Sequence, residues 1–288
     1  MRICRFTTGD EPQYGVLTGE LDEFGQPAED ARVVALAGDP LYVGIKLLDE
    51  EHEVDDVRLL APVLPRSKVV GIGRNYAKHA AEAARIRGGE VAPPTVFTKA
   101  LTTIAGPHAD IAIDPAVSEQ IDWEVDLGVV IGRGGVNIPR ERALEHVFGY
   151  TVVNDVTARD IQSGWGGQFF KGKSLDGSCP SGPWVVTADE VPNPQALALR
   201  LTVNGTVKQD ASTADMIYAV DAIISWVSVG MTLPPGTLIA TGTPEGVGFA
   251  RQPPEFLRAG DVMEAEVEGI GTLRNRMVAA RQSSGANV

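Results

Sequence analysis

The sequence has little cysteine. Its 288 residues include only Cys4 and Cys179, which form no CxxC or Cys/His pattern. Neither a disulfide framework nor a structural zinc site is therefore indicated. A chain of this length can sustain a hydrophobic core without such cross-links. We expect a protein of the reducing cytoplasm.

The sequence also lacks a long apolar run. The longest apolar stretch, residues 219–233, is interrupted by Asp221 and Ser225, and it is shorter than the roughly 20 residues that span a bilayer. Residues 1–10 contain Arg2 and Arg5 but no apolar segment behind them, so a secretory signal is not indicated. We expect a soluble protein with no membrane partner.

Basic residues are scarce relative to acidic ones. Lys and Arg total 25 and Asp and Glu total 38, which gives a formal net charge of -13 and a pI near 4.8. Such a chain repels nucleic acid and anionic lipid, because phosphate binding needs clustered Lys and Arg. We expect no nucleic-acid partner. An acidic protein that binds an anionic substrate must gather its few cations, or a bound metal ion, in one place.

Turn residues and apolar spacing divide the chain into a small N-terminal lobe, residues 1–62, a larger region, residues 63–281, and a disordered tail, residues 282–288. The larger region consists mostly of short β-branched runs separated by Gly, Pro and Asp, which are strand and turn signals. Asn204 and Gly205 are the favoured pair for a type I′ hairpin turn. Helical spacing is confined to residues 77–86, 140–146 and 213–228, with Ser212 or Thr213 as the cap of the last. The fold class is therefore α+β and mostly β, with a small α/β lobe at the N-terminus.

Three carboxylates are candidate metal ligands. Glu124 and Asp126 alternate along a predicted strand and so share one face, and Asp155 follows the apolar run of residues 150–153. Carboxylates held this close share a proton or a cation, and oxygen-only ligands suit Mg²⁺, Mn²⁺ or Ca²⁺. The alternative is a solvated edge-strand face with no site.

Candidate groups for acid–base and substrate chemistry lie nearby in sequence. His79 and Glu82 are three residues apart on a predicted helix, where they can form a proton-transfer pair or an ordinary exposed pair. Arg159 offers a planar fork for a carboxylate, Gln162 an amide donor and Lys173 a compact cation for an enolate oxygen. The Gly-rich loop 241–248 can bring backbone amides to an anion, but it is not a Walker loop. GxGxxG is also not completed before a helix, so no dinucleotide site is indicated.

Six segments, in consistent order over residues 69–278, resemble the fumarylacetoacetate hydrolase superfamily. They are Gly73-Arg-Asn-Tyr-Ala-Lys-His-Ala-Ala-Glu, Phe97-Thr-Lys, Trp123-Glu-Val-Asp-Leu-Gly-Val-Val-Ile-Gly, Gly149-Tyr-Thr-Val-Val-Asn-Asp-Val-Thr-Ala-Arg-Asp-Ile-Gln, Gly172-Lys-Ser and Thr241-Gly-Thr-Pro. The resemblance implies a mixed β-sandwich roll, usually a homodimer, with Mg²⁺ or Mn²⁺ at the mouth of the roll.

Residue by residue, the resemblance implies metal ligands at Glu124, Asp126 and Asp155. It also implies an acid–base dyad at His79 and Glu82, an oxyanion-stabilising Lys173, and substrate contacts at Arg159, Gln162, Lys99 and Thr243. The chain departs from the family pattern at one ligand, because the family usually has Glu where this sequence has Asp126. The shorter side chain reaches a metal only if the strand or metal shifts, or through water.

The resemblance further implies a 2-oxo or 2,4-dioxo acid substrate. A 2-oxo acid can chelate a metal ion that stabilises the enolate formed when a neighbouring bond breaks. We expect hydrolysis of a C–C bond in an acylpyruvate-like substrate. The alternatives are decarboxylation of an oxaloacetate-type acid and isomerisation of 5-carboxymethyl-2-hydroxymuconate or 2-hydroxyhepta-2,4-diene-1,7-dioate. An alternative of another class is a non-catalytic, metal-bound ligand-binding protein on the same fold.

Overall fold

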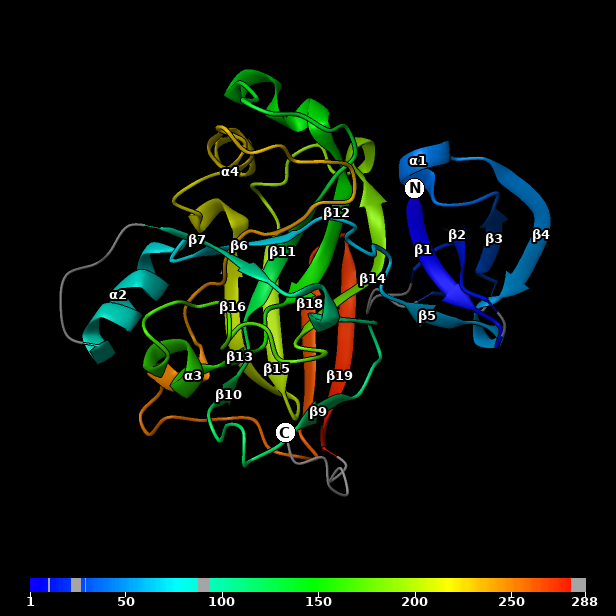
Figure 1. The fold of residues 1–288 in the computed structure, drawn as a ribbon. Helices are drawn as coiled ribbons and strands as arrows, with labels where there is room; N and C mark the ends of the chain where they lie inside the picture. The colour runs from blue at the N-terminus through cyan, green and yellow to red at the C-terminus, as the bar shows by residue number, and fades with distance from the viewer. Residues whose placement is uncertain (10, 22–26, 29, 88–93, 281–288) are drawn as a thin grey trace, which may run out of the picture.

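The computed structural model describes residues 1–9, 11–21, 27–28, 30–87 and 94–280, and it is built mainly from strands with few helices (Figure 1). The predicted α+β, mostly β class is confirmed. The predicted tail, residues 282–288, lies outside the described residues. In the part of the chain that the structure describes, no helix has the length and apolarity needed to cross a membrane.

The N-terminal strands form an antiparallel meander at the right of Figure 1. Its elements are β1 (Arg2–Thr7), β2 (Gln13–Thr18), β3 (Arg32–Leu36), α1 (Pro40–Val43), β4 (Leu47–Glu53) and β5 (Arg58–Leu60). β1 also pairs with β14 (Cys179–Thr187), with Arg2 opposite Val186. The sheet of the lobe is therefore continuous with the large sheet of the remaining chain.

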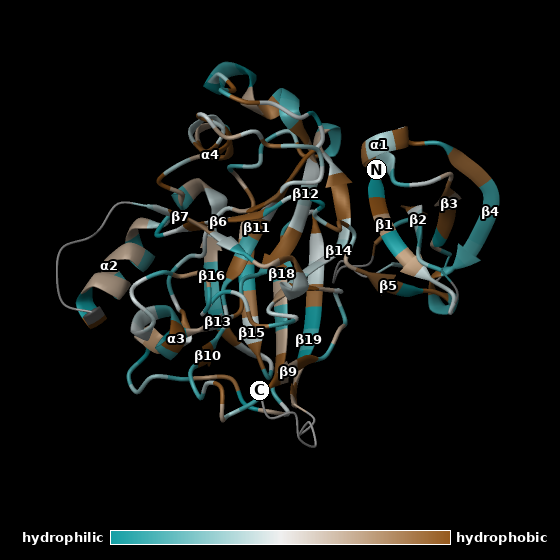
Figure 2. Ribbon diagram, in the orientation of Figure 1, coloured by the Kyte–Doolittle hydropathy of each residue, from teal (hydrophilic) through white to brown (hydrophobic). Residues whose placement is uncertain are grey.

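The large sheet has the strand order β4-β3-β2-β1-β14-β12-β11-β17-β6-β7. Its other strands are β12 (Val147–Asn154), β11 (Val125–Ile131), β17 (Leu238–Ala240), β6 (Val69–Gly73) and β7 (Thr95–Lys99), while β8 (Ile104–Ala105) pairs with β14. Every residue of β11 and β14 is buried. Strands covered on both faces carry apolar residues on either side, as β11 does over residues 127–131 and β14 over residues 184–186 (Figure 2), although Asp126 also lies in β11.

A second, five-stranded sheet packs on β12 and β14 through β18 and β19. It contains β16 (Thr206–Ser212), β15 (Ala198–Val203), β18 (Val262–Val267), β19 (Gly271–Ala279) and β9 (Ile111–Ile113). Burial alternates along β15 and β19, so one face of this sheet meets the core and the other meets solvent. Two facing sheets of this kind form the predicted β-sandwich core.

Further helices and a short strand pair lie outside these sheets. They are α2 (Ala77–Arg87), the short pair β10 (Ile121–Asp122) and β13 (Thr157–Ala158), α3 (Arg159–Gly164), and α4 (Val220–Val227). In Figure 1, α2 and α3 lie on the side of the molecule opposite the N-terminal lobe.

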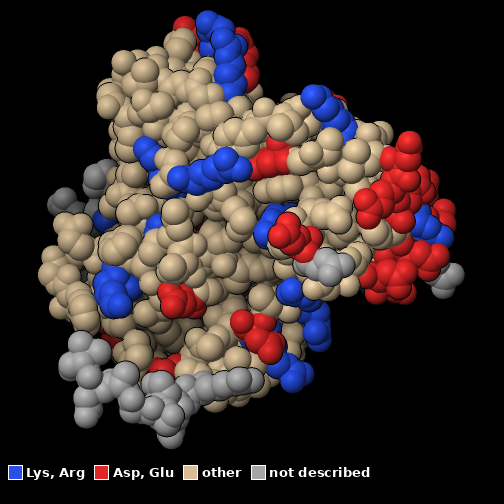
Figure 3. Space-filling model, turned by 45° about the vertical axis from the view of Figure 1, so that its right-hand side comes forward, with Lys and Arg blue, Asp and Glu red and all other residues tan. Residues whose placement is uncertain are grey.

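Many acidic side chains gather on the N-terminal lobe, where β4 exposes most of its residues (Figure 3).

The predicted hairpin turn is confirmed. Asn204 and Gly205 have φ angles of 51° and 75° between β15 and β16. Two successive positive φ angles are what a type I′ turn requires, and its twist matches that of the paired strands.

The predicted helix over residues 213–228 is wrong in its first half. Residues 213–215 form a 3₁₀ turn, capped by the Ser212 hydroxyl, which accepts a hydrogen bond from the Ala214 amide at 3.2 Å. The next residues bind a distant loop: the Ile217 amide donates to the Asn75 carbonyl at 2.7 Å, and the Tyr218 amide donates to Asn75 Oδ1 at 2.8 Å. These bonds replace helical ones, so α4 begins only at Val220. Residues 140–146 are likewise helical but of the 3₁₀ type.

Candidate active site

The three predicted metal ligands lie together where β11 begins and β12 ends. β11 and β12 are antiparallel, with Val125 opposite Asn154. Glu124 therefore lies just before β11, beside Asp155, which lies just after β12. The Asp155 amide donates to the Glu124 carbonyl at 2.8 Å. Asp126 is the second residue of β11, and all three carboxylates are buried.

Two lysines bind these carboxylates. Lys173 Nζ donates to Glu124 Oε2 and to Asp155 Oδ2, each at 2.6 Å. Lys99 Nζ donates to Asp155 Oδ1 at 2.6 Å and to the Val156 carbonyl at 3.2 Å. Asp155 thus has one lysine on each oxygen. Lys99, predicted as a substrate contact, lies behind Asp155 with a fully buried side chain.

Arg159 forms an ion pair with Asp122, a carboxylate that was not predicted as a site residue. Arg159 Nε donates to Asp122 Oδ2 at 2.7 Å, and Arg159 Nη1 lies 2.7 Å from Glu124 Oε1. Gln162 Oε1 accepts from the same guanidinium at 3.3 Å. Asp122 also accepts hydrogen bonds from three backbone amides, which belong to Trp123 (2.8 Å), Gly248 (2.7 Å) and Phe249 (3.0 Å).

The signal for Asp122 is present in the sequence. The alternation that singled out Glu124 and Asp126 extends two residues back to Asp122, which lies in β10. Alternate residues of extended backbone point the same way. The three acids form a row, in which Asp122 fixes Arg159 and Glu124 binds both Arg159 and Lys173.

Opposing effects set the charge states of these groups. Burial raises the pKa of Glu124, but the charges of Lys173 and Arg159 outweigh burial and bring it to about 2. Burial raises the pKa of Asp126 well above its usual range, and the negative charges of Asp155 and Glu124 raise it further. Burial lowers the pKa of Lys173, yet Asp155 and Glu124 reverse this and raise it. The raised pKa means that Asp126 favours its protonated, neutral form more than a carboxyl group in water does.

Several buried polar atoms at this place have no hydrogen-bond partner within the described residues. They are Asp126 Oδ1, Arg159 Nη2, His79 Nδ1 and the Tyr76 hydroxyl. The other oxygen of Asp126, Oδ2, accepts from the Gly242 amide at 2.8 Å. An unpartnered buried polar atom costs about 1–3 kcal/mol. Buried polar atoms without partners, gathered in one place, are typical of a site that binds a polar ligand.

His79 and Glu82 form a pair on α2. His79 Nδ1 lies 3.6 Å from Glu82 Oε2, and the side chains are 8% and 18% exposed. The Gly246 amide donates to both Glu82 oxygens at 3.3 Å, which orients the carboxylate. The pair is therefore shielded from solvent, which strengthens an electrostatic contact between the two groups.

A cavity brings most of the candidate residues to one space. Its walls carry His79, Glu124, Arg159, Gln162, Lys173 and Thr243. Its aromatic walls are rings that the sequence did not single out: Phe249 lies 4.5 Å from the Arg159 guanidinium carbon, and Phe97 lies 4.9 Å from Lys173 Nζ. Thr243 also lies on this wall, and its hydroxyl donates a hydrogen bond to the Val125 carbonyl at 3.0 Å. The arrangement can bind an anion, stabilise a developing negative charge and transfer a proton.

The fit of a metal ion can be judged from the donor set. Among the described residues, no three His, Cys, Asp or Glu side chains are arranged as a ready metal site, and Lys173 bridges Glu124 and Asp155. The donors nevertheless suit a hard cation, because the three carboxylates offer only oxygen and Asp126 Oδ1 has no partner. The donor set of these residues therefore fits a divalent cation.

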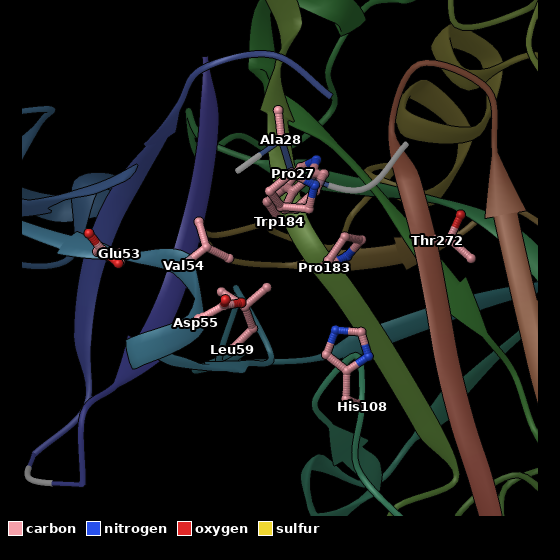
Figure 4. Close-up of a pocket in the computed structure, with 10 residues that line it drawn as sticks. All are labelled: Pro27, Ala28, Glu53, Val54, Asp55, Leu59, His108, Pro183, Trp184 and Thr272. Atoms are coloured by element: carbon pink, nitrogen blue, oxygen red, sulfur yellow. The ribbon is translucent and has the colours of Figure 1, made fainter. Parts of the chain in front are cut away.

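A separate cavity of about 310 Å³ lies between the N-terminal lobe and β14 (Figure 4). Val54 and Leu59 approach it from the lobe, and His108 and Trp184 from the larger region. None of the candidate catalytic or metal-binding residues lines it. It is therefore distinct from the candidate active site.

Comparisons with known proteins place the chain in a family. The family model described as "Fumarylacetoacetate (FAA) hydrolase C-terminal" matches residues 68–278, and the model "Rv2993c-like, N-terminal" matches residues 1–62. An uncharacterized protein of Staphylococcus epidermidis is 44% identical over 227 residues, which cover 78% of this chain and 74% of that protein.

Solved structures agree over nearly the whole chain. The 2-hydroxyhepta-2,4-diene-1,7-dioate isomerase of Mycobacterium marinum is 38% identical with a TM-score of 0.83, covering 98% of this chain and 100% of that chain. The fumarylacetoacetate hydrolase of Exiguobacterium antarcticum is 38% identical with a TM-score of 0.82, covering 97% and 100%. The sequence motifs, the fold and these comparisons agree, and the chain belongs to the fumarylacetoacetate hydrolase family.

Proposed function

We propose that this chain is a Mg²⁺- or Mn²⁺-dependent enzyme that hydrolyses a C–C bond in an acylpyruvate-like 2,4-dioxo acid. The observation that carries the proposal is that His79, shielded and paired with Glu82, lies on the wall of the cavity that Glu124, Arg159 and Lys173 also line. A proton-transfer pair beside an anion-binding cluster is what hydrolysis of such a substrate requires.

Glu124, Asp126 and Asp155 would hold the metal ion, for which Ca²⁺ is a candidate substitute. When bound, a divalent ion polarises the carboxylate and keto oxygens of a 2-oxo acid as a Lewis acid. Lys99 keeps Asp155 in place through its bond to Oδ1. Asp126 is held from the other side by the Gly242 amide.

The remaining side chains would act on the substrate itself. Arg159 Nη2 has no partner within the described residues and can donate to the substrate carboxylate, next to the amide of Gln162. Lys173 places a buried ammonium where an enolate oxygen would develop. His79 takes a proton from water, and Glu82 stabilises the imidazolium that results. The water oxygen then attacks the distal carbonyl, the C–C bond breaks to release a carboxylic acid, and its electron pair forms the enolate of pyruvate. The imidazolium of His79 returns its proton to the enolate carbon, which gives pyruvate and restores the neutral base.

Isomerisation is the second candidate, and the similarity to the Mycobacterium marinum isomerase over nearly the whole chain favours it. In that reaction His79 would move a proton from the enol hydroxyl to a carbon of the diene chain instead of activating water. Decarboxylation of an oxaloacetate-type acid would need no water at the site.

Product analysis separates these reactions. Acetylpyruvate, oxaloacetate and 5-carboxymethyl-2-hydroxymuconate are incubated in ¹⁸O-water with Mg²⁺ or Mn²⁺, with and without EDTA. Hydrolysis places ¹⁸O in the acetate product, decarboxylation releases CO₂, and isomerisation leaves the substrate mass unchanged. Metal binding without turnover of any of the three would favour a non-catalytic ligand-binding protein and overturn the proposal.

Variants of α2 test the role of the pair. His79→Ala and Glu82→Gln are expected to lower kcat by about 100-fold or more, because positioned acid–base groups contribute 10²- to 10⁴-fold. Lys78→Gln is the matched control, since its side chain is 73% exposed on the same helix. Equal kcat in all three variants would contradict a catalytic role for the pair.

The proposal extends to a cytoplasmic homodimer. Exposed apolar side chains gather at and near α4, among them Ile217, Tyr218, Trp226 and Val229. The rings of Tyr218 and Trp226 stack at 5.7 Å. Aromatic residues on an exposed apolar patch are typical of subunit contacts. Light scattering at micromolar concentration would give one chain mass instead of two if this part of the proposal is wrong.

A further inference from the structure

A short segment joins two parts of the candidate active site. It covers residues 246–250 and ends in a 3₁₀ turn. We refer to it as the bridging segment. On one side it binds Glu82 of α2, and on the other it binds Asp122, the ion-pair partner of Arg159. The proton-transfer pair and the anion-binding guanidinium are therefore attached to the same stretch of backbone.

Side chains from one face of α2 bind the bridging segment. Both oxygens of Glu82 accept from the Gly246 amide at 3.3 Å, and Arg85 Nη2 donates to the Ala250 carbonyl at 3.2 Å. Residues three apart in a helix are neighbours on its surface. Because both ends of the bridging segment bind this face, they fix the rotation of α2 about its axis and with it the direction of His79.

Gly246 is held by contacts around its own backbone. Its carbonyl accepts from Trp123 Nε1 at 3.2 Å and from Arg251 Nη2 at 3.4 Å. Its φ angle is 96°, and a Cβ at this position would lie 2.1 Å from the Lys208 carbonyl oxygen. Only glycine satisfies both the positive φ and this close approach. These contacts fix the direction of the Gly246 amide, which points at Glu82.

Arg251 ties the bridging segment to the five-stranded sheet. Its Nη2 atom donates to the Lys208 carbonyl in β16 at 2.8 Å as well as to the Gly246 carbonyl. One guanidinium nitrogen thus connects two carbonyls from different parts of the fold. Neither Arg251 nor Gly246 lines the active-site cavity, so neither contacts a substrate bound there. An effect of either residue on the reaction must pass through Glu82.

The other end of the bridging segment is fixed separately. Asp122 accepts from the amides of Gly248 at 2.7 Å and Phe249 at 3.0 Å, and the Phe249 ring lies 4.5 Å from the Arg159 guanidinium carbon. A change at Gly246 therefore leaves the contacts of Arg159 in place. Experiments can distinguish the two ends, because one orients the proton-transfer pair and the other holds a substrate contact.

We infer that Gly246 and Arg251 are positioning residues, which hold Glu82 so that His79 presents its base to the cavity. The inference rests on the proposed function, because it concerns the same proton-transfer pair. Glu82 Oε2 lies 3.6 Å from His79 Nδ1. A carboxylate held at Nδ1 favours the tautomer that carries its proton there, which leaves Nε2 as the base. A misplacement of about 1 Å can cost about 100-fold in rate.

The kinetic test uses Gly246→Ala with acetylpyruvate, or with the substrate that the product analysis identifies. The added Cβ does not fit against the Lys208 carbonyl, so the amide moves away from Glu82. We expect kcat to fall about 10- to 100-fold, the equivalent of one hydrogen bond to a charged group, while KM stays within about twofold. Gly269→Ala is the matched control, since its φ is 71° and nothing lies within 4 Å of its Cβ. An equal fall in kcat for both variants, or a rise in KM as large as the fall in kcat, would overturn the inference.

A second pair of variants decides the question if Gly246→Ala does not fold. Arg251→Met removes the donor to the Gly246 carbonyl without adding an atom against the backbone, and should lower kcat about 3- to 10-fold. Arg251→Lys keeps a donor and should recover most of that loss. Arg142→Met removes a 53% exposed arginine elsewhere and should leave kcat unchanged. Equal kcat for Arg251→Met and Arg251→Lys would contradict a positioning role.

A spectroscopic experiment separates the inference from the proposed function. Protein labelled with ¹⁵N-histidine is observed by NMR without substrate, and the His79 ring signals are assigned by their absence in His79→Ala. Glu82→Gln shows the signals of a ring that has lost its carboxylate partner. Gly246→Ala, or Arg251→Met if the former does not fold, should move the His79 signals in the same direction. Unmoved signals would refute the inference, whereas the expected movement without turnover of an acylpyruvate would contradict only the proposed reaction.

Discussion

Asp122→Asn is the substitution that most directly tests how the active-site cluster is held. Asp122 Oδ1 accepts from the amides of Trp123 and Gly248, and Oδ2 accepts from Arg159 Nε and the Phe249 amide. An asparagine has one acceptor atom and one donor atom at these places. Either orientation of its amide therefore puts an NH₂ group against two donors, and the charge that pairs with Arg159 is lost.

The magnitude follows from these four contacts. Each buried donor left without a partner costs about 1–3 kcal/mol, and breaking a buried ion pair from one side costs about 3–5 kcal/mol. These terms overlap, so we expect the free energy of unfolding to fall by about 3–5 kcal/mol. At about 2–4 °C per kcal/mol for a large domain, Tm should fall by about 10 °C.

The assay is urea and thermal denaturation followed by circular dichroism, together with the KM for an acylpyruvate. KM should rise as well, because Arg159 loses the carboxylate that fixes its Nε. Glu141→Gln is the control, since Glu141 is exposed and such substitutions stay within about 0.5 kcal/mol. A loss of stability below about 1 kcal/mol for Asp122→Asn would refute the reasoning, because the four contacts would then carry no net energy.

Two other predictions concern the metal and the cavity wall. EDTA should abolish turnover. Added Mn²⁺ should restore turnover in the unsubstituted protein but not in Glu124→Gln. Unchanged rates in EDTA would exclude a metal ion from the reaction. A Cβ at Gly71 would lie 2.2 Å from the Phe97 ring, so Gly71→Ala should cost about 1–3 kcal/mol in urea denaturation and raise KM by moving a cavity wall. Gly164→Ala, where nothing lies within 4 Å, is its control; equal stability of the two variants would argue against this packing effect.

Local patterns predicted the elements that depend on local forces. Alternation along one strand predicted that Glu124 and Asp126 share a face, and the end of an apolar run predicted where Asp155 emerges. The Asn-Gly pair predicted its turn, because the turn depends on the φ angles of those two residues alone. Each of these features is set within a few residues of sequence.

Features that depend on distant contacts could not be predicted. The prediction of a helix over residues 213–228 was wrong in its first half because the Tyr218 amide donates to the side chain of Asn75, more than 140 positions away, and not to a helical carbonyl. The role of Lys99 depends on Asp155, which is 56 residues away in the chain. The place of Phe97 and Phe169 on the wall of the active-site cavity depends on the pairing of β7 with β6 and on a segment about 70 residues further along, and no spacing in the sequence predicts it.

The charge of the buried cluster connects the metal and the substrate. Asp122, Glu124, Asp126 and Asp155 face Lys99, Arg159 and Lys173, so the cluster has one negative charge in excess once Asp126, whose pKa is raised, loses its proton. A divalent cation would reverse this to one positive charge, and a single substrate carboxylate would cancel it. A second carboxylate would again be unbalanced there, and burying an unpaired charge is costly. A substrate with two carboxylates therefore needs a cation outside the cluster to balance the second one.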